Sequence, residues 1–174
     1  MKEEWFDLVD PDGTVIGHAP RSLCHTHPGL LHQAVHVLVF NRRGELFLQK
    51  RSPRKDVQPG KWDTSVGGHV GPGEARETAA RRELQEELGI AGVELTPAYS
   101  YRWTSEIESE IITAFAIEYD GPVRIDPNEI SEGRYWPLAE IAARLDDGGF
   151  TPQFVQEFPR MLAWRRRHAN EVNA

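Results

Sequence analysis

The sequence predicts an α/β (α+β) fold in which a mixed β-sheet carries helices on its faces. Several segments with strand character precede a central run of strong helix formers, and two more strand-like segments follow that run. The last part of the chain shows a helical pattern of apolar residues. Strands and helices in this order favour a sheet covered by helices rather than a bundle or an all-β sandwich.

The first half contains an N-terminal β-hairpin, predicted over about residues 4–20 because the turn signal Asp10-Pro11-Asp12-Gly13 separates two strand-like runs. Residues 21–32 show little periodicity and are expected to form a loop. The expected strands of this half cover residues 5–9, 14–18, 34–40 and 45–50. A basic loop with proline and glycine follows over residues 51–62.

The second half begins with the helix predicted over residues 74–88, which has apolar positions at Ala80, Leu84 and Leu88 and a stop signal at Gly89. Further strands are expected over residues 93–103 and 110–119, with a last one ending at about Tyr135-Trp136. Helices are expected over residues 137–145 and about 152–168.

Size and charge limit the classes of function. The 174 residues suit one domain over residues 1–174, and Cys24, the single cysteine, excludes an internal disulfide. A net charge of −7 disfavours nucleic-acid or anionic-membrane partners, because these need a cationic surface. No apolar run reaches the length of a signal peptide or a membrane span, so we expect a cytoplasmic protein.

Three glutamates stand together in the predicted central helix. Glu83 and Glu87 are four residues apart and share one face, and Glu86 lies within a turn of both. Like charges at this spacing destabilise a helix by about 0.2–0.5 kcal/mol per pair. Mg²⁺ would offset that repulsion, since it takes carboxylate oxygens and bridges them to substrate phosphates. The alternative is an ordinary solvated acidic face.

The complete pattern around these glutamates favours the metal site. Residues 68–90 fit G-x5-E-x7-R-E-U-x-E-E-x-G-U (U aliphatic) at every fixed position, and seven specified residues match by chance on the order of 10⁻⁹ per start site. This pattern is the Nudix box, and the sequence resembles the Nudix superfamily. The resemblance implies an α/β/α sandwich with a mixed sheet, in which the loop and helix of the box hold the metal.

The resemblance also implies roles within the box. Glu83 and Glu87 would be the principal metal ligands, and Glu86 a ligand or a group that positions water. Arg82 would orient the glutamates, Glu74 would support the junction of loop and helix, and the carbonyl of Gly67 or Gly68 would complete the metal shell. The candidate bases are Glu83, Glu129 and Glu132, and ordinary surface acids are the alternative for the last two.

A second set of residues resembles the Nudix branch that contains isopentenyl-diphosphate isomerase. The stretch LFLQKRSPRKDVQPGKWDTSVGGH is similar to that enzyme's pattern. By this resemblance His25, His32 and His69, together with Glu108 and Glu110, would form a site for Zn²⁺, Mn²⁺ or a similar ion. Glu110 would also be a catalytic carboxylate. The alternative is that these five residues are surface or core positions.

Two departures separate the sequence from the isomerase. The isomerase has an essential cysteine where this chain has Gly67, which cannot transfer a proton, and its Nudix box is degenerate whereas this one is complete. Gln153 and its neighbours also replace an aromatic-rich stretch that would line a prenyl pocket. These differences favour hydrolysis over isomerisation.

The expected substrate site uses the basic loop. Arg51, Lys55 and Lys61 are suited to diphosphate oxygens, and Trp103 is a candidate to cover an organic group. A solvated charged turn is the alternative for the three cations.

We therefore expect a Nudix pyrophosphohydrolase that uses Mg²⁺ or Mn²⁺ and cleaves a diphosphate linkage in a small nucleoside diphosphate or other organic diphosphate. The alternatives are an isomerase of a prenyl diphosphate and a non-catalytic diphosphate-binding module. We expect a monomer or a homodimer.

Overall fold

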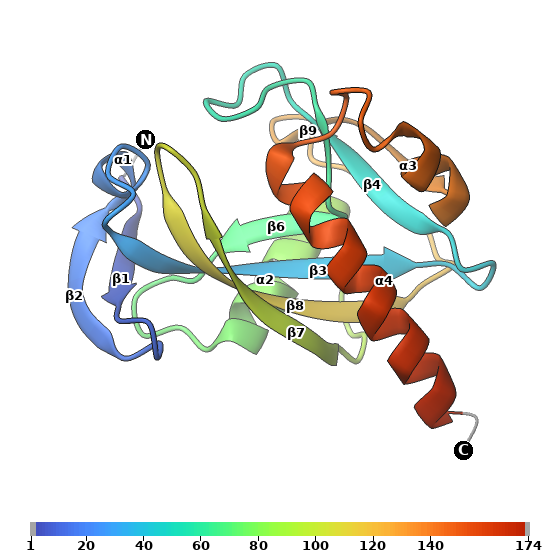
Figure 1. The fold of residues 1–174 in the computed structure, drawn as a ribbon, viewed down its shortest axis with the longest axis horizontal. Coiled ribbons are helices and arrows are strands. Elements are labelled where there is room, and N and C mark those ends of the chain that lie inside the picture. The colour runs from blue at the N-terminus through green and yellow to red at the C-terminus, as the bar shows by residue number, and fades with distance from the viewer. Residues whose placement is uncertain (1–2, 173–174) are drawn as a thin grey trace.

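The computed structural model describes residues 3–172, and the strands in this range form a nine-stranded mixed sheet (Figure 1). The strands are β1 (Trp5–Val9), β2 (Val15–Pro20), β3 (Leu31–Phe40), β4 (Leu46–Arg51), β5 (Trp62–Asp63), β6 (Val66–His69), β7 (Thr96–Thr104), β8 (Ser109–Glu118) and β9 (Ile130–Trp136). The helices are α1 (Arg21–Cys24), α2 (Arg76–Leu88), α3 (Leu138–Arg144) and α4 (Pro152–Val172). The predicted mixed fold is confirmed.

Strand β3 is the centre of the sheet. It pairs parallel with β8 along its whole length and antiparallel with β1, β4 and β6. The register of β3 and β8 places His32 opposite Glu110, and the register of β3 and β6 places Ala34 opposite His69. Chain segments far apart in sequence thus bring histidines and a glutamate to neighbouring positions on the sheet.

Helices α2 and α4 cover opposite faces of the sheet (Figure 1). Alternate side chains of β3 pack on the two faces of the sheet, because successive side chains of a strand point to opposite sides. Val35, Val37 and Val39 pack in the core beneath α2, whereas Leu38 and Phe40 pack in the core beneath α4. Burying each such side chain stabilises the fold by about 1.5–3 kcal/mol. No described helix is both long and apolar enough to cross a bilayer.

The loop before α2 is closed by a side chain of the Nudix-like segment. The helix begins at Arg76 rather than at Glu74, because the Glu74 carboxylate accepts a hydrogen bond from the backbone N–H of Gly71 (2.8 Å) and closes the preceding turn. The helix ends at Leu88 and is capped by Gly89, which adopts φ 67°, as the stop signal predicts. Residues Glu83 and Glu87 are therefore held in a helix fixed at both ends.

The prediction of a loop over residues 21–32 is wrong at both ends. Arg21–Cys24 form the short helix α1, whose single turn leaves no periodicity to detect in the sequence. Strand β3 begins at Leu31 rather than at Ala34, because its first residues pair with β8 and His32 also pairs with Leu8 of β1. Strand β7 begins at Thr96 rather than at Val93, whose side chain packs in the core beneath α2.

Candidate active site

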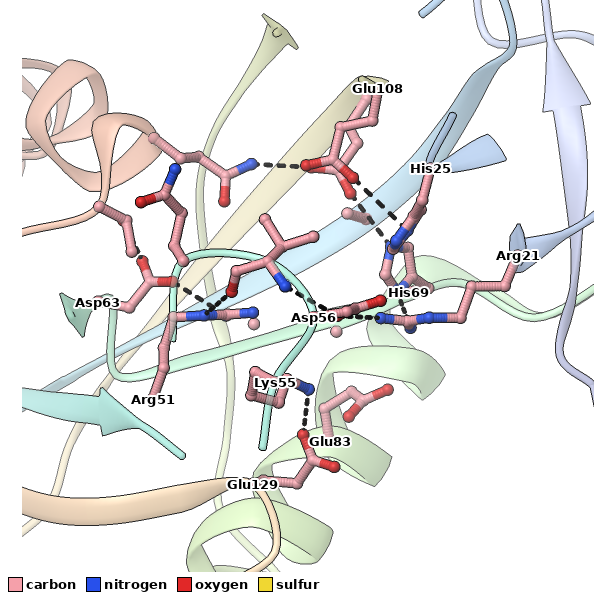
Figure 2. Close-up of a pocket in the computed structure, with 18 of the residues that line it drawn as sticks. Arg21, His25, Arg51, Lys55, Asp56, Asp63, His69, Glu83, Glu108 and Glu129 are labelled. Atoms are coloured by element: carbon pink, nitrogen blue, oxygen red, sulfur yellow. Dashed lines mark hydrogen bonds and ion pairs between the residues drawn. The ribbon is translucent and has the colours of Figure 1, made fainter. Parts of the chain in front are cut away.

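A cavity of about 1240 Å³ lies where β3, β6, α2 and the loops after β4 and β7 meet. Glu83 on α2, Lys55 and Glu129 lie on one side of it, and His25, His69 and Glu108 lie on another (Figure 2). The predicted site residues that line the cavity are Arg51, Lys55, Gly67, Gly68, His25, His69, Arg82, Glu83, Glu86, Glu87, Trp103, Glu108, Glu110 and Glu129. The fold therefore brings most of the predicted site residues to one place.

Arg82 connects the loop and the helix of the predicted Nudix box. Its guanidinium donates to both carboxylate oxygens of Glu74 (3.0 and 2.9 Å), to Glu83 (2.6 Å) and to Glu86 (3.4 Å). It also donates to the backbone carbonyl of His69 (3.0 Å). The two-point contact with Glu74 fixes the plane of the guanidinium, so the orientation of Glu83 follows from that of Arg82.

The three glutamates of α2 differ in exposure. Glu87 is buried and accepts a hydrogen bond from the side-chain amide of Gln49 (2.9 Å), whereas the Glu86 side chain is exposed. Burial raises the pKa of Glu87 to about 8, and the neighbouring charge of Glu83 adds to the rise. Burial likewise raises the pKa of Glu83 to about 7. A divalent cation bound by these carboxylates would stabilise their charged form and lower their pKa values.

Two of the three cations predicted to bind diphosphate line the cavity. Arg51 is held by the carbonyl of Val57 (2.9 Å) and by Asp63 (3.2 Å), and Lys55 forms an ion pair with Glu129. Lys61 departs from the prediction, since it is not among the described residues that line the cavity. Its backbone carbonyl accepts from Arg51 N–H, which places Lys61 in the hairpin that supports the loop.

The two later candidate bases occupy different places. Glu129 lines the cavity, whereas Glu132 is not among the lining residues and lies 3.6 Å from the Lys50 ammonium on a partly exposed part of β9. Glu129 precedes β9, whereas Glu132 lies within β9 opposite Lys50, so the structure separates two acids that the sequence alone left equivalent. The geometry therefore favours Glu129 over Glu132.

Three histidines converge at the other end of the cavity, where His25 and His69 line it, whereas His32 is fully buried and is not among the described lining residues. Each offers a ring nitrogen, and these nitrogens of His25, His32 and His69 all lie within 4.8 Å of one another. Glu108 approaches His25 (3.5 Å), and Glu110 approaches both His69 (3.2 Å) and His32 (3.6 Å). These five residues, here called the His/Glu cluster, come from four separate segments.

The donors of the His/Glu cluster fit a metal ion. The Nε2 of His32 is buried and has no hydrogen-bond partner in the described part of the chain, although it faces the other ring nitrogens. Burial lowers the pKa of His25 to about 3 and also lowers that of His69, whereas the contact with Glu110 outweighs burial and raises the pKa of His32. Neutral imidazoles and carboxylates suit Zn²⁺ or Mn²⁺.

Phe6 fixes the orientation of two of these rings. Its ring stacks on His69 at 4.4 Å and on His32 at 5.1 Å between centroids. The predicted N-terminal hairpin therefore has a place in the site, which its sequence did not indicate.

Sequence reasoning missed several lining residues. Arg21 contacts Glu4 (3.0 Å), His69 (3.4 Å) and Asp56 (3.9 Å), and so joins α1 to the basic loop across the cavity. His36, which the sequence left without a role, also lines the cavity. Only its place two positions after Ala34 on a strand could have indicated this, since that spacing puts it on the face of His32.

Comparison with known proteins agrees with this geometry. The NUDIX domain model matches residues 30–158. The chain is 36% identical over 153 residues to an uncharacterised Nudix hydrolase of Yersinia pestis, which covers 88% of this chain and 82% of the relative. It is 36% identical over 156 residues to an isopentenyl-diphosphate delta-isomerase of Streptomyces avermitilis, covering 86% and 79%.

A crystal structure of a Deinococcus radiodurans protein superposes with a TM-score of 0.81 at 27% identity, covering 91% of this chain and 99% of that one. A MutT protein structure from Methanosarcina mazei superposes with a TM-score of 0.67 at 26% identity, covering 75% and 92%. The domain match, the identities and the superpositions lead to one conclusion: the chain belongs to the Nudix hydrolase family.

Proposed function

We propose that this enzyme uses Mg²⁺ or Mn²⁺ to hydrolyse a diphosphate linkage in a small organic diphosphate. The observation that carries this proposal is the arrangement of charge in one cavity. Glu83, Glu86 and Glu87 lie on one wall, and Arg51 and Lys55 face the same space. Carboxylates that hold a cation beside side chains that hold phosphate oxygens suit the cleavage of a diphosphate.

Each group has a part in the reaction. Mg²⁺ held by Glu83, Glu86 and Glu87 would offset the charge of the diphosphate oxygens and lower the pKa of the attacking water. Arg51 and Lys55 bind the diphosphate and hold the phosphorus in line with that water. Glu83 or Glu129 accepts the proton of the water, and Arg82 keeps the Glu83 carboxylate aimed at the cavity.

The His/Glu cluster is proposed as a second site, for Zn²⁺ or a similar ion. Its support is the convergence of three ring nitrogens, one of them buried without a partner among the described residues. The cluster opens into the same cavity as the α2 glutamates, so its metal would lie beside the same substrate.

Isomerisation of a prenyl diphosphate is the second candidate function. It is favoured by the His/Glu cluster and by relatives that are named isopentenyl-diphosphate delta-isomerase. Gly67 argues against it, because the position lines the cavity and offers no side chain for proton transfer. A diphosphate-binding module without catalysis is disfavoured by the complete glutamate set.

Phosphate or pyrophosphate release tests the proposal. The panel comprises nucleoside diphosphates, dinucleotides, nucleotide sugars and prenyl diphosphates, each with Mg²⁺ and with Mn²⁺. Metal-dependent release from any class supports hydrolysis. If no substrate in the panel releases phosphate or pyrophosphate and the protein rearranges isopentenyl diphosphate, the proposal of hydrolysis is wrong and the activity is isomerisation.

A further inference from the structure

Asp63 is a buried carboxylate beside the cavity, and it belongs to neither of the two predicted metal sites. It lies in the short strand β5, lines the cavity and is only 5% exposed. Figure 2 shows it next to Arg51, with a dashed line joining the two side chains. A charge is costly to bury unless a countercharge and hydrogen bonds compensate it, so the partners of Asp63 indicate what it does.

Three donors hold the two oxygens of this carboxylate. Oδ1 accepts from the backbone N–H of Thr64 (2.9 Å) and from the hydroxyl of Thr151 (2.8 Å). Oδ2 accepts from Nη1 of Arg51 (3.2 Å). The first two donors fix the carboxylate, and the fixed Oδ2 then determines where the guanidinium lies.

The Thr151 hydroxyl is itself fixed, because Thr151 caps the start of α4. Its Oγ1 accepts from the backbone N–H of Phe154 (3.1 Å) while it donates to Asp63. The backbone N–H of Thr151 donates to the carbonyl of Trp62 (2.9 Å), and the N–H of Trp62 donates to the carbonyl of Gly149 (2.9 Å). Strand β5 and the start of α4 therefore form one hydrogen-bonded unit that holds Asp63.

The guanidinium of Arg51 is held on one part and free on another. Its Nε donates to the carbonyl of Val57 (2.9 Å), and its Nη1 donates to Asp63. These bonds use two of the five N–H donors of a guanidinium, and the other three have no hydrogen-bond partner in the described part of the chain. Because Arg51 lines the cavity, a planar guanidinium held in this way presents its free donors to phosphate oxygens in a fixed direction.

Lys55, the other cation proposed to bind the diphosphate, has no comparable support. Its described ion-pair partner is Glu129, whose side chain is 39% exposed, and a lysine carries its charge on a flexible stem. Of the two cations, Arg51 is the one whose direction the fold determines, and the buried carboxylate of Asp63 is part of that determination.

We propose that Asp63 is a positioning residue, which holds the Arg51 guanidinium in the orientation that binds the diphosphate. It acts on the substrate only through Arg51, and Thr151 fixes it from the start of α4. The inference rests on the proposed function and extends it to a carboxylate outside both predicted metal sites. An ion pair that only stabilised the fold would change diphosphate affinity equally with and without Arg51.

Binding of methylenediphosphonate, a diphosphate analogue with a bridge that resists hydrolysis, tests the inference without turnover. Titration calorimetry with Mg²⁺ would measure its Kd before and after Asp63→Asn in three backgrounds, which are the wild type, Arg51→Gln and Lys55→Met. Asparagine keeps the size of the side chain and an oxygen for Thr64 and Thr151. We expect Asp63→Asn to weaken binding about 10-fold or more in the wild type and in Lys55→Met, but less than about twofold in Arg51→Gln.

Circular dichroism checks that each variant is folded. Arg51→Gln keeps an amide that can donate to Asp63, and Arg51→Met is the second choice for this background. If Asp63→Asn does not fold, Thr151→Val takes its place, because it removes the hydroxyl that fixes Oδ1. It should weaken binding about threefold or more, again only where Arg51 is present.

Equal weakening in all three backgrounds would show that Asp63 acts through the fold in general and would overturn the inference. Unchanged affinity of Asp63→Asn in the wild type would also overturn it, as would an Arg51 variant that binds the analogue as tightly as the wild type does. The expected pattern of affinities, together with no phosphate release from any diphosphate, would contradict the proposed hydrolysis alone.

Discussion

A β-carbon on Gly68 would lie 2.1 Å from Cδ of Glu83, so the backbone of β6 and the carboxylate of α2 are in direct contact. The clash involves the end of a side chain rather than backbone, and Glu83 can move away from it. A side chain at position 68 would therefore move the Glu83 carboxylate, with little effect on the stability of the fold.

The variant Gly68→Ala should displace the Glu83 carboxylate and lower kcat/KM by about 10- to 100-fold, because displacement by about 1 Å costs that much in a catalytic site. The free energy of unfolding should change by about 1 kcal/mol or less. Steady-state kinetics and thermal unfolding measure the two effects. Loss of stability without loss of activity would contradict the argument.

The buried glutamates predict a dependence on pH. The pKa values of Glu83 (about 7) and Glu87 (about 8) are raised, so the folded protein binds their protons more tightly than the unfolded chain does. Their contribution to stability is present at pH 4 and is lost as pH rises through 7 and 8. A bound cation requires the charged forms and reverses this loss.

Mg²⁺ should therefore raise the Tm more at pH 8.5 than at pH 6. Scanning calorimetry with EDTA and with Mg²⁺ at both pH values measures the difference, and Glu87→Gln should reduce it. An equal Mg²⁺ effect at the two pH values would indicate that these glutamates do not hold the cation.

The basic loop offers a matched pair of lysines. Lys55 lines the cavity and Lys61 does not, although they are six residues apart in one loop. Lys55→Met should raise KM for the diphosphate by about 10-fold or more, since it removes a charged hydrogen bond. Lys61→Met should leave KM within about twofold. If both substitutions raised KM to a similar extent, the lysines would act through the overall positive charge of the loop rather than through direct contact of Lys55 with the substrate.

The His/Glu cluster predicts metal content in the purified protein. Elemental analysis after dialysis should find about one transition-metal ion per chain. His32→Gln should lower the metal affinity by at least about 10-fold, because removal even of a supporting group costs 10- to 100-fold. His27→Gln is the control, since His27 is exposed and its side chain hydrogen-bonds to Leu23 and Thr26 of its own segment. Equal metal content in both variants would exclude His32 as a ligand.

Local patterns in the sequence predicted much of the fold and the α2 wall of the site. Spacing within one helix placed Glu83, Glu86 and Glu87 together, and runs of strand-forming residues identified β3, β4 and β8. Lys61 and Glu132 could not be excluded in this way, because the cavity wall depends on which strands pair and where β4 bulges.

The pair of His36 and Glu157 lay beyond sequence reasoning for the same kind of reason. These residues are 121 positions apart and meet only because α4 packs on the face of β3 that carries His36. Neither residue belongs to a local motif. Long-range packing, rather than spacing, creates this contact.

The most direct test of the central claim compares phosphate release by the wild type and by Glu87→Gln in Mg²⁺, using whichever diphosphate the wild type cleaves fastest. The substitution keeps the size of the side chain and its contact with Gln49, so the fold should persist. We predict that kcat falls at least about 100-fold with an unchanged circular dichroism spectrum. A variant that releases phosphate at the wild-type rate would contradict the claim that the α2 glutamates carry the reaction.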